Sequence, residues 1–331
     1  METILTVIPA DKSAAVKTAL LQAFQTEEPE SIEILSGGLS TALVYKIGIR
    51  GKHYLLRLVM EVNAMNDPKR QFTCLRLAAS AEIAPKVYYT SVTDGISITD
   101  FIYTQPQTDK TNLLHELATT AKKIHELPLF PSFMNFLEGI DLFIVGFKAS
   151  GLFSATATAE LFALYHKIRT TYHWQEVDLV SSHNDLNPNN ILFDGAKSWI
   201  IDWEAAFLND RYVDLAIIAQ SYARKPEQQH LLLKTYFDAE PTDYQKARFF
   251  LMQQVCLLYY GLMMFRLVTD HVVTDTDLSA PSPEDFYALL AGGQVSLNNA
   301  EGQLQYGKVL FNQLLINLRS QKFEEALELL S

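Results

Sequence analysis

The sequence contains only two cysteines among 331 residues, Cys74 and Cys256, and neither sits near a group of Cys and His residues. This scarcity excludes a disulfide framework and a Cys/His zinc site, and we expect a cytoplasmic protein in a reducing compartment. Basic residues are also in deficit, because 27 Lys and Arg stand against 38 Asp and Glu, a formal net charge of -11. Such a surface repels nucleic-acid phosphates, so no nucleic-acid partner is expected.

Long apolar and long polar runs are both absent. The most apolar stretch, residues 255–265, is shorter than the roughly 20 residues that a membrane-spanning helix needs, so it predicts a buried helix and no membrane association. Residues 1–10 lack the basic segment of a secretory signal, and we do not expect export. Hydrophobic residues make up 48% of the chain and charged residues 20%, which indicates a globular protein, and the length favours two lobes.

The N-terminal lobe, residues 1–103, is expected to be a small antiparallel sheet with one inserted helix. A leading helix begins at Asp11 and ends before Pro29, and the inserted helix covers about residues 67–81. Strand-like runs occupy residues 32–35, 42–49, 53–59, 86–89 and 96–101. The first hundred residues therefore predict an antiparallel sheet.

The C-terminal lobe, residues 104–331, is mainly helical in its periodicity, with a short β interruption at residues 191–201. Predicted helices cover residues 109–126, 133–148, 156–172, 211–223, 226–237, 243–268 and 302–318. The fold class is therefore predicted to be α+β, with two lobes joined by a tight hinge at residues 99–105. A cleft between two lobes is the natural place for a ligand.

Turn-forming polar residues fill residues 182–190 and lead directly into an apolar strand. The pair Asp194-Gly195 favours a hairpin turn, and the second strand ends at Asp202. An antiparallel hairpin places the start of its first strand beside the end of its second, so we expect Asn190 and Asp202 to face each other. Amide and carboxylate oxygens, completed by phosphate and water, predict a magnesium site rather than a zinc or copper one.

Asp185 lies five residues before Asn190 in the same loop. At that spacing its carboxylate can orient an attacking hydroxyl group against a phosphate held by the metal, so the pattern predicts phosphoryl transfer with Asp185 as the catalytic residue. The alternative is a polar turn whose side chains only cap backbone groups. His183 is expected to brace the loop through hydrogen bonds rather than to act as an acid or base.

The same loop and hairpin carry a resemblance to the choline/ethanolamine kinase and aminoglycoside phosphotransferase superfamily, with the choline-kinase-like branch nearest. The motifs are His183-Asn184-Asp185, Asn190-Ile191-Leu192, Ile201-Asp202-Trp203-Glu204, and Asn209-Asp210 followed by Asp214-Leu215-Ala216. The resemblance covers about residues 36–268. It implies a bilobal protein-kinase-like fold and an ATP-dependent kinase that uses Mg²⁺ to phosphorylate the hydroxyl group of a small molecule.

The resemblance also assigns residues to the nucleotide. Gly37, Gly38 and Ser40 resemble a phosphate loop, in which adjacent glycines let backbone amides approach phosphate oxygens, although a plain hairpin turn is the alternative. Arg57 falls on the opposite face of its strand from Leu58 and matches a basic residue that contacts the α- and β-phosphates.

Two further parts of the nucleotide site follow from the resemblance. Gln71 stands where the family has a glutamate that braces the basic residue, so we expect a neutral hydrogen bond there, or a brace from Glu61 or Glu82 instead. The backbone of Thr99, Asp100 and Phe101 is expected to bind the adenine edge.

For the acceptor, the resemblance places Glu204 and Asp210 near the substrate, although Asp210 has local helix capping as its alternative. Tyr260 and Met263 occupy positions at which choline kinases present tryptophans to a quaternary ammonium group, and an ordinary core stripe is the alternative. Tyr offers a cation-π face and Met a soft apolar contact. A cationic amino or ammonium alcohol such as choline or ethanolamine is therefore expected, with aminoglycosides, thiamine, sugars or a weakly catalytic nucleotide-binding protein as open alternatives.

Overall fold

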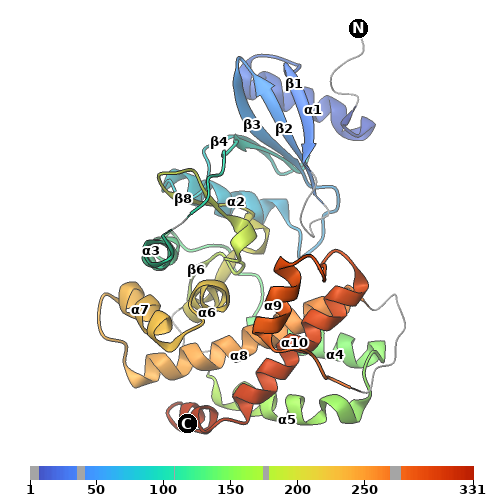
Figure 1. The fold of residues 1–331 in the computed structure, drawn as a ribbon. Coiled ribbons are helices and arrows are strands. Elements are labelled where there is room, and N and C mark those ends of the chain that lie inside the picture. The colour runs from blue at the N-terminus through green and yellow to red at the C-terminus, as the bar shows by residue number, and fades with distance from the viewer. Residues whose placement is uncertain (1–6, 36–41, 108, 174–178, 269–276) are drawn as a thin grey trace. The chain divides into compact units, whose positions relative to one another are not determined.

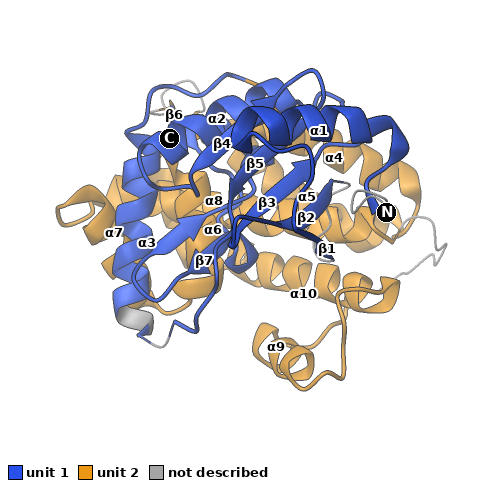
Figure 2. Cartoon of the chain, turned by 90° about the horizontal axis from the view of Figure 1, so that it is seen from above, with its two compact units in different colours: residues 1–132, 180–208 blue, residues 133–179, 209–331 orange. Residues whose placement is uncertain are grey.

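The computed structural model describes residues 7–35, 42–107, 109–173, 179–268 and 277–331 (Figure 1). The chain forms two compact units: residues 1–132 with 180–208, and residues 133–179 with 209–331 (Figure 2). An antiparallel sheet and a larger set of helices are present, so the predicted α+β, protein-kinase-like fold is confirmed. The predicted lobe boundary at residues 99–105 lies inside the first unit, and it stays a prediction.

The first unit contains a five-stranded antiparallel sheet with the strand order β1-β2-β3-β5-β4. Its strands are β1 (Ser31–Leu35), β2 (Leu43–Ile49), β3 (Lys52–Leu58), β4 (Val87–Ser91) and β5 (Ile96–Asp100). The helices of this part are α1 (Ala10–Phe24), α2 (Pro68–Ser80) and α3 (Lys110–His125). All of these elements were predicted within a few residues of their ends.

Local chemistry explains where these elements begin and turn. Arg50 and Gly51 have φ values of 51° and 72°, and two such left-handed residues form the tight turn that suits the β2–β3 hairpin. Helix α2 begins after Asp67, whose side chain accepts a hydrogen bond from the backbone N of Lys69 at 2.9 Å. Pro68 fills the first helical position, where no backbone donor is needed.

Strand β3 places Leu56 and Leu58 on one face and Arg57 on the other. Leu56 and Leu58 point into the core of the first unit and are fully buried. Because side chains alternate along a strand, Arg57 lies on the opposite face. The sheet register pairs Arg57 with Val44 of β2 and with Ser97 of β5. The sheet therefore presents one guanidinium group on the face away from its core.

The chain returns to the first unit through a series of short elements. They are β6 (Leu179–Ser182), the 3₁₀ turn η3 (Pro188–Asn190), β7 (Ile191–Phe193), β8 (Ser198–Ile200), the 3₁₀ turn η4 (Trp203–Ala205) and β9 (Phe207–Asp210). The strands β7 and β8 pair antiparallel, as expected for a hairpin. Strand β6 pairs with β9. Helix α2 packs against η4, and Cys74 Sγ donates to the backbone O of Ala206 at 3.6 Å. This returning segment therefore packs on residues more than a hundred positions earlier.

The second unit is helical. Its helices are α4 (Phe136–Ser150), α5 (Ala155–Thr171), α6 (Arg211–Tyr222), α7 (Pro226–Phe237), α8 (Asp243–Arg266), α9 (Pro283–Ala291), α10 (Ala300–Leu318) and α11 (Gln321–Glu328). Helix α8 packs against α4, α6, α10 and α11. Glycines let α8 and α10 approach closely, because a Cβ at Gly261 would lie 2.6 Å from the Phe311 ring and one at Gly307 would lie 2.5 Å from Phe265.

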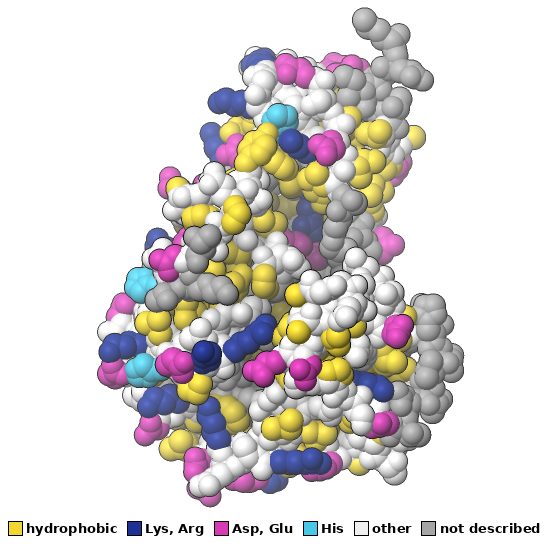
Figure 3. Space-filling model, in the orientation of Figure 1, with side chains coloured by type: hydrophobic (Ala, Val, Ile, Leu, Met, Phe, Trp, Pro, Cys, Tyr) yellow, Lys and Arg dark blue, Asp and Glu magenta, His cyan; other side chains and the backbone are white. Residues whose placement is uncertain are grey.

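The predicted core helix at residues 255–265 is confirmed as part of α8, where Val255, Leu258 and Leu262 are buried. Among the described residues, no helix combines the length and apolar character that a bilayer crossing requires. Helices α9 and α11 and strands β6 and β9 were not predicted. They are too short for a clear hydrophobic period, and β6 and β9 pair across a long stretch of sequence. On the face shown in Figure 3, basic side chains are interspersed with acidic ones.

Candidate active site

The loop between β6 and β7 is held together by amide side chains. Asn187 Nδ2 donates to Asp185 Oδ1 at 2.9 Å, and Asn190 Nδ2 donates to Asp185 Oδ2 at 2.8 Å. Asn190 Nδ2 also donates to the backbone O of Asp185 at 2.9 Å. Asp185 is only half-buried. Its carboxylate is therefore fixed in orientation by two amides while part of its surface remains open to a small molecule.

His183 is the first residue of this loop and is completely buried. The backbone N–H of Asp185 points at His183 Nδ1 at 3.3 Å, and His183 Nε2 lies 2.9 Å from the backbone O of Ile201. If Nδ1 accepts, Nε2 carries the proton and donates, which fixes one neutral tautomer. The imidazole also packs edge-on against Trp203, with ring centres 4.7 Å apart. These contacts connect the Asp185 loop to the end of β8.

The predicted hairpin is confirmed. The register pairs Ile191 with Ile200, and the backbone N of Ile201 donates to the backbone O of Asn190 at 3.0 Å. Asn190 therefore lies beside the residue that precedes Asp202. At the turn, Asp194 Oδ1 accepts from two backbone N–H groups, in line with the turn chemistry expected from the sequence.

Two non-glycine residues of the site adopt left-handed backbone conformations, Asn184 with φ 64° and Asp202 with φ 62°. Each such conformation costs about 1–3 kcal/mol and persists only where the surrounding structure holds it. For Asn184 the support is visible, because its Nδ2 donates to the backbone O of Ala205 at 2.9 Å. Backbone strain is therefore present in the loop that contains Asn184 and in the segment after β8 that contains Asp202.

The oxygen atoms at this end of the hairpin fit Mg²⁺. The side-chain bonds of Asn190 use its nitrogen and leave Oδ1 as an acceptor, and Asp202 adds a carboxylate. Within the described part of the chain, no three His, Cys, Asp or Glu side chains gather closely enough to hold a metal ion. Mg²⁺ is commonly bound by one or two protein carboxylates with phosphate and water as the other ligands. Asn190 and Asp202 therefore suit Mg²⁺ when a phosphate completes the site.

Arg57 pairs with two carboxylates. Its Nη1 donates to Asp202 Oδ1 and its Nη2 to Glu204 Oε2, although these residues follow it by 145 and 147 positions. The Arg57 side chain is 10% exposed, against 28% for Asp202 and 29% for Glu204. Burial, the largest influence, lowers the pKa of Arg57, but the two carboxylates together raise it above its ordinary value. The guanidinium group therefore stays charged.

The predicted hydrogen bond between Arg57 and Gln71 is wrong. Gln71 is 3% exposed, and its Oε1 has no hydrogen-bond partner among the described residues. This oxygen is the only Gln71 side-chain atom that could accept a bond from a guanidinium group. The partners of Arg57 come from the segment after β8 instead. One of these partners is Glu204, which lies two positions after Asp202 and which the resemblance had placed near the acceptor.

The backbone donors at the predicted adenine site are used within the sheet. Asp100 N donates to the backbone O of Lys86 at 2.9 Å, and Phe101 N donates to the backbone O of His53 at 3.4 Å. Thr99 is buried inside β5. The N–H groups of Asp100 and Phe101 are therefore occupied, and binding of the adenine edge by the backbone of residues 99–101 stays a prediction.

Gly37, Gly38 and Ser40 fall within residues 36–41, which lie outside the described residues. Their place in a phosphate loop stays a prediction. The strands on either side are described, and β1 pairs with β2 from Ser31 opposite Gly48 to Leu35 opposite Val44. The loop that contains the glycines therefore joins two paired strands, as predicted.

Tyr260 and Met263 lie on α8 in the second unit, and both are half-buried. The Tyr260 ring centre is 5.4 Å from that of Tyr259, which lies 5.5 Å from the ring of Phe136 on α4. Aromatic rings therefore line this part of α8. The acceptor roles of Tyr260 and Met263 stay predictions.

Asp210 is a structural residue of the second unit. Its Oδ1 accepts from the backbone N of Tyr212 at 2.9 Å and so caps α6. Its Oδ2 accepts from the Tyr172 hydroxyl group at 2.5 Å and from Arg248 Nη2 at 3.3 Å, all within a completely buried cluster. The capping alternative for Asp210 is therefore confirmed.

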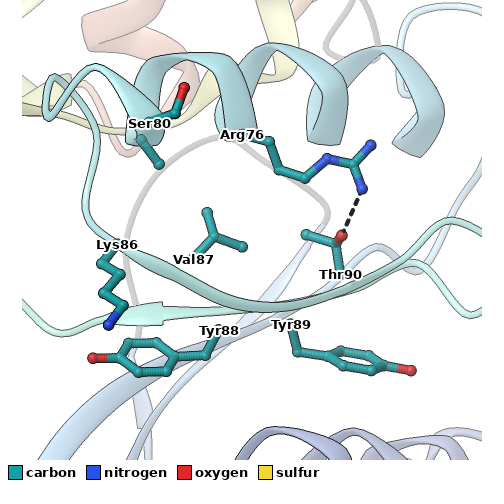
Figure 4. Close-up of a pocket in the computed structure, with 8 residues that line it drawn as sticks. Arg76, Ser80, Lys86, Val87, Tyr88, Tyr89 and Thr90 are labelled. Atoms are coloured by element: carbon teal, nitrogen blue, oxygen red, sulfur yellow. Dashed lines mark hydrogen bonds between the residues drawn. The ribbon is translucent and has the colours of Figure 1, made fainter.

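A separate pocket lies in the first unit between α2 and β4 (Figure 4). Arg76 donates to Thr90 Oγ1 at 3.1 Å, and Lys86 Nζ lies 5.0 Å from the Tyr88 ring centre. None of the predicted site residues lines this pocket. It is therefore distinct from the candidate active site.

A five-stranded antiparallel sheet with an inserted helix, followed by the Asp185 loop and its hairpin, defines a phosphotransferase of the protein-kinase-like fold class. The family model described as "Phosphotransferase enzyme family" (APH) matches residues 31–250, which is more than half of the chain. The chain therefore belongs to the phosphotransferase enzyme family. The predicted superfamily and the predicted enzyme class are confirmed.

Solved structures share this fold at low identity. A choline/ethanolamine kinase family protein from Mesorhizobium loti is 19% identical with a TM-score of 0.69, and the match covers 96% of this chain and 99% of that one. Choline kinase LicA from Streptococcus pneumoniae is 17% identical with a TM-score of 0.61, over 93% of this chain and 99% of that one. Spectinomycin phosphotransferase APH(9)-Ia is 14% identical with a TM-score of 0.56, over 88% and 94%.

Sequence relatives match over shorter segments. Protein LicA from Haemophilus influenzae is 37% identical over 75 residues, which is 23% of this chain and 28% of the relative. The matches to curated relatives span 13% to 28% of those relatives' lengths. The chain is therefore similar to these relatives only over short segments of each protein.

Proposed function

We propose that this protein is an ATP-dependent kinase that phosphorylates the hydroxyl group of a small molecule, with a cationic alcohol such as choline or ethanolamine as the first candidate. The observation that carries the proposal is the held carboxylate of Asp185, which accepts one amide bond on each of its oxygens. This carboxylate adjoins a hairpin in which the backbone of Asn190 is bonded to Ile201, the residue before Asp202, and this supports the proposal that Asn190 and Asp202 share one metal ion. A carboxylate beside a phosphate-binding metal site is the arrangement that phosphoryl transfer to an alcohol requires.

Asp185 has a defined task in this proposal. Each carboxylate oxygen carries two lone pairs and can accept more than one hydrogen bond. A hydroxyl group that donates to this carboxylate is oriented for attack on the γ-phosphorus of ATP. Its proton passes to Asp185 as the new O–P bond forms, and the bond from the γ-phosphorus to the bridging oxygen breaks, so that ADP leaves with that oxygen. Asn187 and Asn190 keep the acceptor atom in place during this step.

In this proposal the phosphates of ATP are bound by Arg57 of β3 and by the loop between β1 and β2. Arg57 offers a charged, largely buried guanidinium group, and Gly37, Gly38 and Ser40 would offer backbone and hydroxyl donors. When bound by Asn190 and Asp202, Mg²⁺ would neutralise phosphate charge. Each of these groups acts by positioning and charge rather than by covalent chemistry.

ATP as the donor is supported by related structures. One LicA structure contains AMP, and the spectinomycin phosphotransferase structure contains ADP and spectinomycin. An aminoglycoside 2'-phosphotransferase was solved with GDP, so GTP belongs in the donor assay.

The acceptor is proposed from the choline and ethanolamine kinases among the structures of the same fold, and from the aromatic surface around Tyr260 on α8. An aromatic ring attracts an ammonium group by about 0.5–2 kcal/mol. Aminoglycosides, thiamine and sugars are the competing acceptors. A nucleotide-binding protein with little catalysis is the second candidate function. It is favoured by Gln71, a neutral residue whose Oε1 has no hydrogen-bond partner in the described part of the chain.

The test is ADP release from MgATP with choline, ethanolamine, thiamine, simple sugars and an aminoglycoside as acceptors. We expect a cationic alcohol to give the highest kcat/KM. MgATP binding without acceptor-dependent ADP release would favour the binding protein instead. Phosphorylation of neutral sugars alone would keep the kinase and remove the cationic acceptor.

A further inference from the structure

Two acidic side chains share one guanidinium group at the candidate site, and they have different surroundings. Asp202 lies two residues after the end of β8, at the N-cap of η4, and is the proposed metal ligand, whereas Glu204 lies in the middle of η4. Both side chains pair with Arg57. If Asp202 binds a metal ion, Glu204 is the carboxylate that can still form an ion pair with Arg57.

The backbone of Glu204 is anchored on both sides. Arg70 of α2 donates from Nη2 to the backbone O of Glu204 at 3.1 Å, and the same side chain binds the backbone O of Met65 at 2.5 Å. Trp203, which precedes Glu204, is 1% exposed and donates from Nε1 to the backbone O of Ile200 at 3.1 Å. The Glu204 carboxylate is therefore carried on a rigid turn, as a group that positions another side chain must be.

Helix α2 contributes Arg70 to this arrangement, but its next residue contributes no charge. Gln71 is neutral, and its buried Oε1 accepts no hydrogen bond from the residues that the structure describes. A buried guanidinium group needs an anionic partner, because leaving it unpaired costs several kcal/mol. Through Arg70, helix α2 therefore holds the backbone of Glu204, and Glu204 in turn pairs with Arg57.

We propose that Glu204 is the positioning residue that holds Arg57 in place for the nucleotide phosphates, and that position 71 has no part in holding it. This reassigns Glu204, which the family resemblance had placed near the acceptor. The inference rests on the proposed function for the identity of the ligand that Arg57 meets. The Arg57–Glu204 pair itself is independent of that function.

The experiment compares Glu204→Gln, Glu204→Asp and Gln71→Met with wild-type protein and with Glu33→Gln, an exposed glutamate on β1. The first readout needs neither nucleotide nor turnover: phenylglyoxal modification of Arg57, followed by mass spectrometry of its peptide. We expect Glu204→Gln to raise the modification rate several-fold, Glu204→Asp to restore part of the protection, and Gln71→Met and Glu33→Gln to match wild type. Thermal unfolding of each variant identifies any that fail to fold.

The second readout is kinetic. Glu204→Gln should raise the KM for ATP by about tenfold, the lower end for losing a hydrogen bond between charged groups that are partly exposed, while kcat changes by less than about threefold. Glu204→Asp should recover part of the loss. Unchanged Arg57 reactivity and unchanged KM in a folded Glu204→Gln variant would overturn the proposal, as would a Gln71→Met variant that changes both.

The two proposals fail in different ways. If wild-type protein neither binds nor turns over ATP, the proposed function fails, and Arg57 reactivity still decides the role of Glu204. If ATP is turned over and Glu204→Gln raises the KM for the acceptor alone, Glu204 belongs to the acceptor site and the inference fails.

Discussion

Asn190 donates from one side-chain nitrogen to both the backbone O and the carboxylate of Asp185, at 2.9 and 2.8 Å. A single amide therefore connects the proposed metal ligand set to the proposed catalytic group. Asn187 makes a similar bond to the other carboxylate oxygen, but it lies outside the hairpin.

The first prediction separates these two amides. Asn187→Ala should lower kcat by about 10- to 100-fold, which is the usual effect of losing a hydrogen bond that supports a functional residue. The magnesium requirement should stay unchanged. Asn190→Ala should lower kcat and also weaken magnesium binding. The measurement is kcat as a function of magnesium concentration. Identical magnesium curves for both variants would contradict the assignment of Asn190 as a ligand.

The second prediction concerns Asp185. Asp185→Asn should keep the fold and the affinity for MgATP while kcat falls by about two to four orders of magnitude, because the proton acceptor is lost. Calorimetric binding and steady-state turnover should therefore separate. Asp11→Asn, an exposed change on α1, is the matched control. A wild-type rate for Asp185→Asn with the best acceptor would remove Asp185 from the mechanism.

The third prediction concerns Asp202. Asp202→Asn should abolish the magnesium dependence of nucleotide binding, because it removes the anionic metal ligand. Binding of ATP and ADP is titrated with magnesium and with EDTA. The idea fails if the folded variant keeps the magnesium dependence of wild type.

The fourth prediction is about stability and compares two ion pairs of α8. Arg248 pairs with completely buried Asp210, whereas Lys246 pairs with exposed Asp243 at 3.0 Å. Arg248→Met should destabilise the protein by about 3–5 kcal/mol, because it leaves a buried carboxylate unpaired. Lys246→Met should have little effect, since exposed pairs contribute little. Urea unfolding followed by circular dichroism measures both, and equal midpoints would contradict the buried-pair argument.

The fifth prediction is that both cysteines are unreactive in the native protein. Cys74 and Cys256 are free and at most 1% exposed, and burial raises the pKa of the Cys74 thiol to about 12 and raises that of Cys256 as well. At pH 8 both thiols should remain protonated, and thiolate is the reactive form. Ellman's reagent should label no thiol before urea is added and two afterwards. Rapid labelling of native protein would show that one of the two sites opens.

Much of the first unit could be predicted because the deciding signals are local. The Asp67-Pro68 start of α2, the alternation along β3 and the Asp194-Gly195 turn each depend on a few neighbouring residues. The placement of Asn190 near Asp202 followed from hairpin geometry alone. Local rules therefore reached the loop that carries the proposed chemistry.

The parts that could not be predicted depend on distant residues. Nothing near Arg57 in the sequence indicates that its partners are Asp202 and Glu204, and a family position suggested Gln71 instead. The pairing of β5 with β3 also decides whether the backbone N–H of Phe101 is free to bind a ligand. That register is a property of the folded sheet. Charge partners and register both require the tertiary structure.

The separation along the sequence between Arg57 and its two carboxylate partners also bears on the order of folding. Asp202 follows Arg57 by 145 residues, and at about 5–20 residues per second a ribosome needs roughly 7–30 s to add them. During that interval the sheet can form, but its guanidinium group has neither carboxylate available. We therefore expect the first unit to reach its final state only after residue 204 leaves the ribosome, and chains stopped earlier to depend on chaperones.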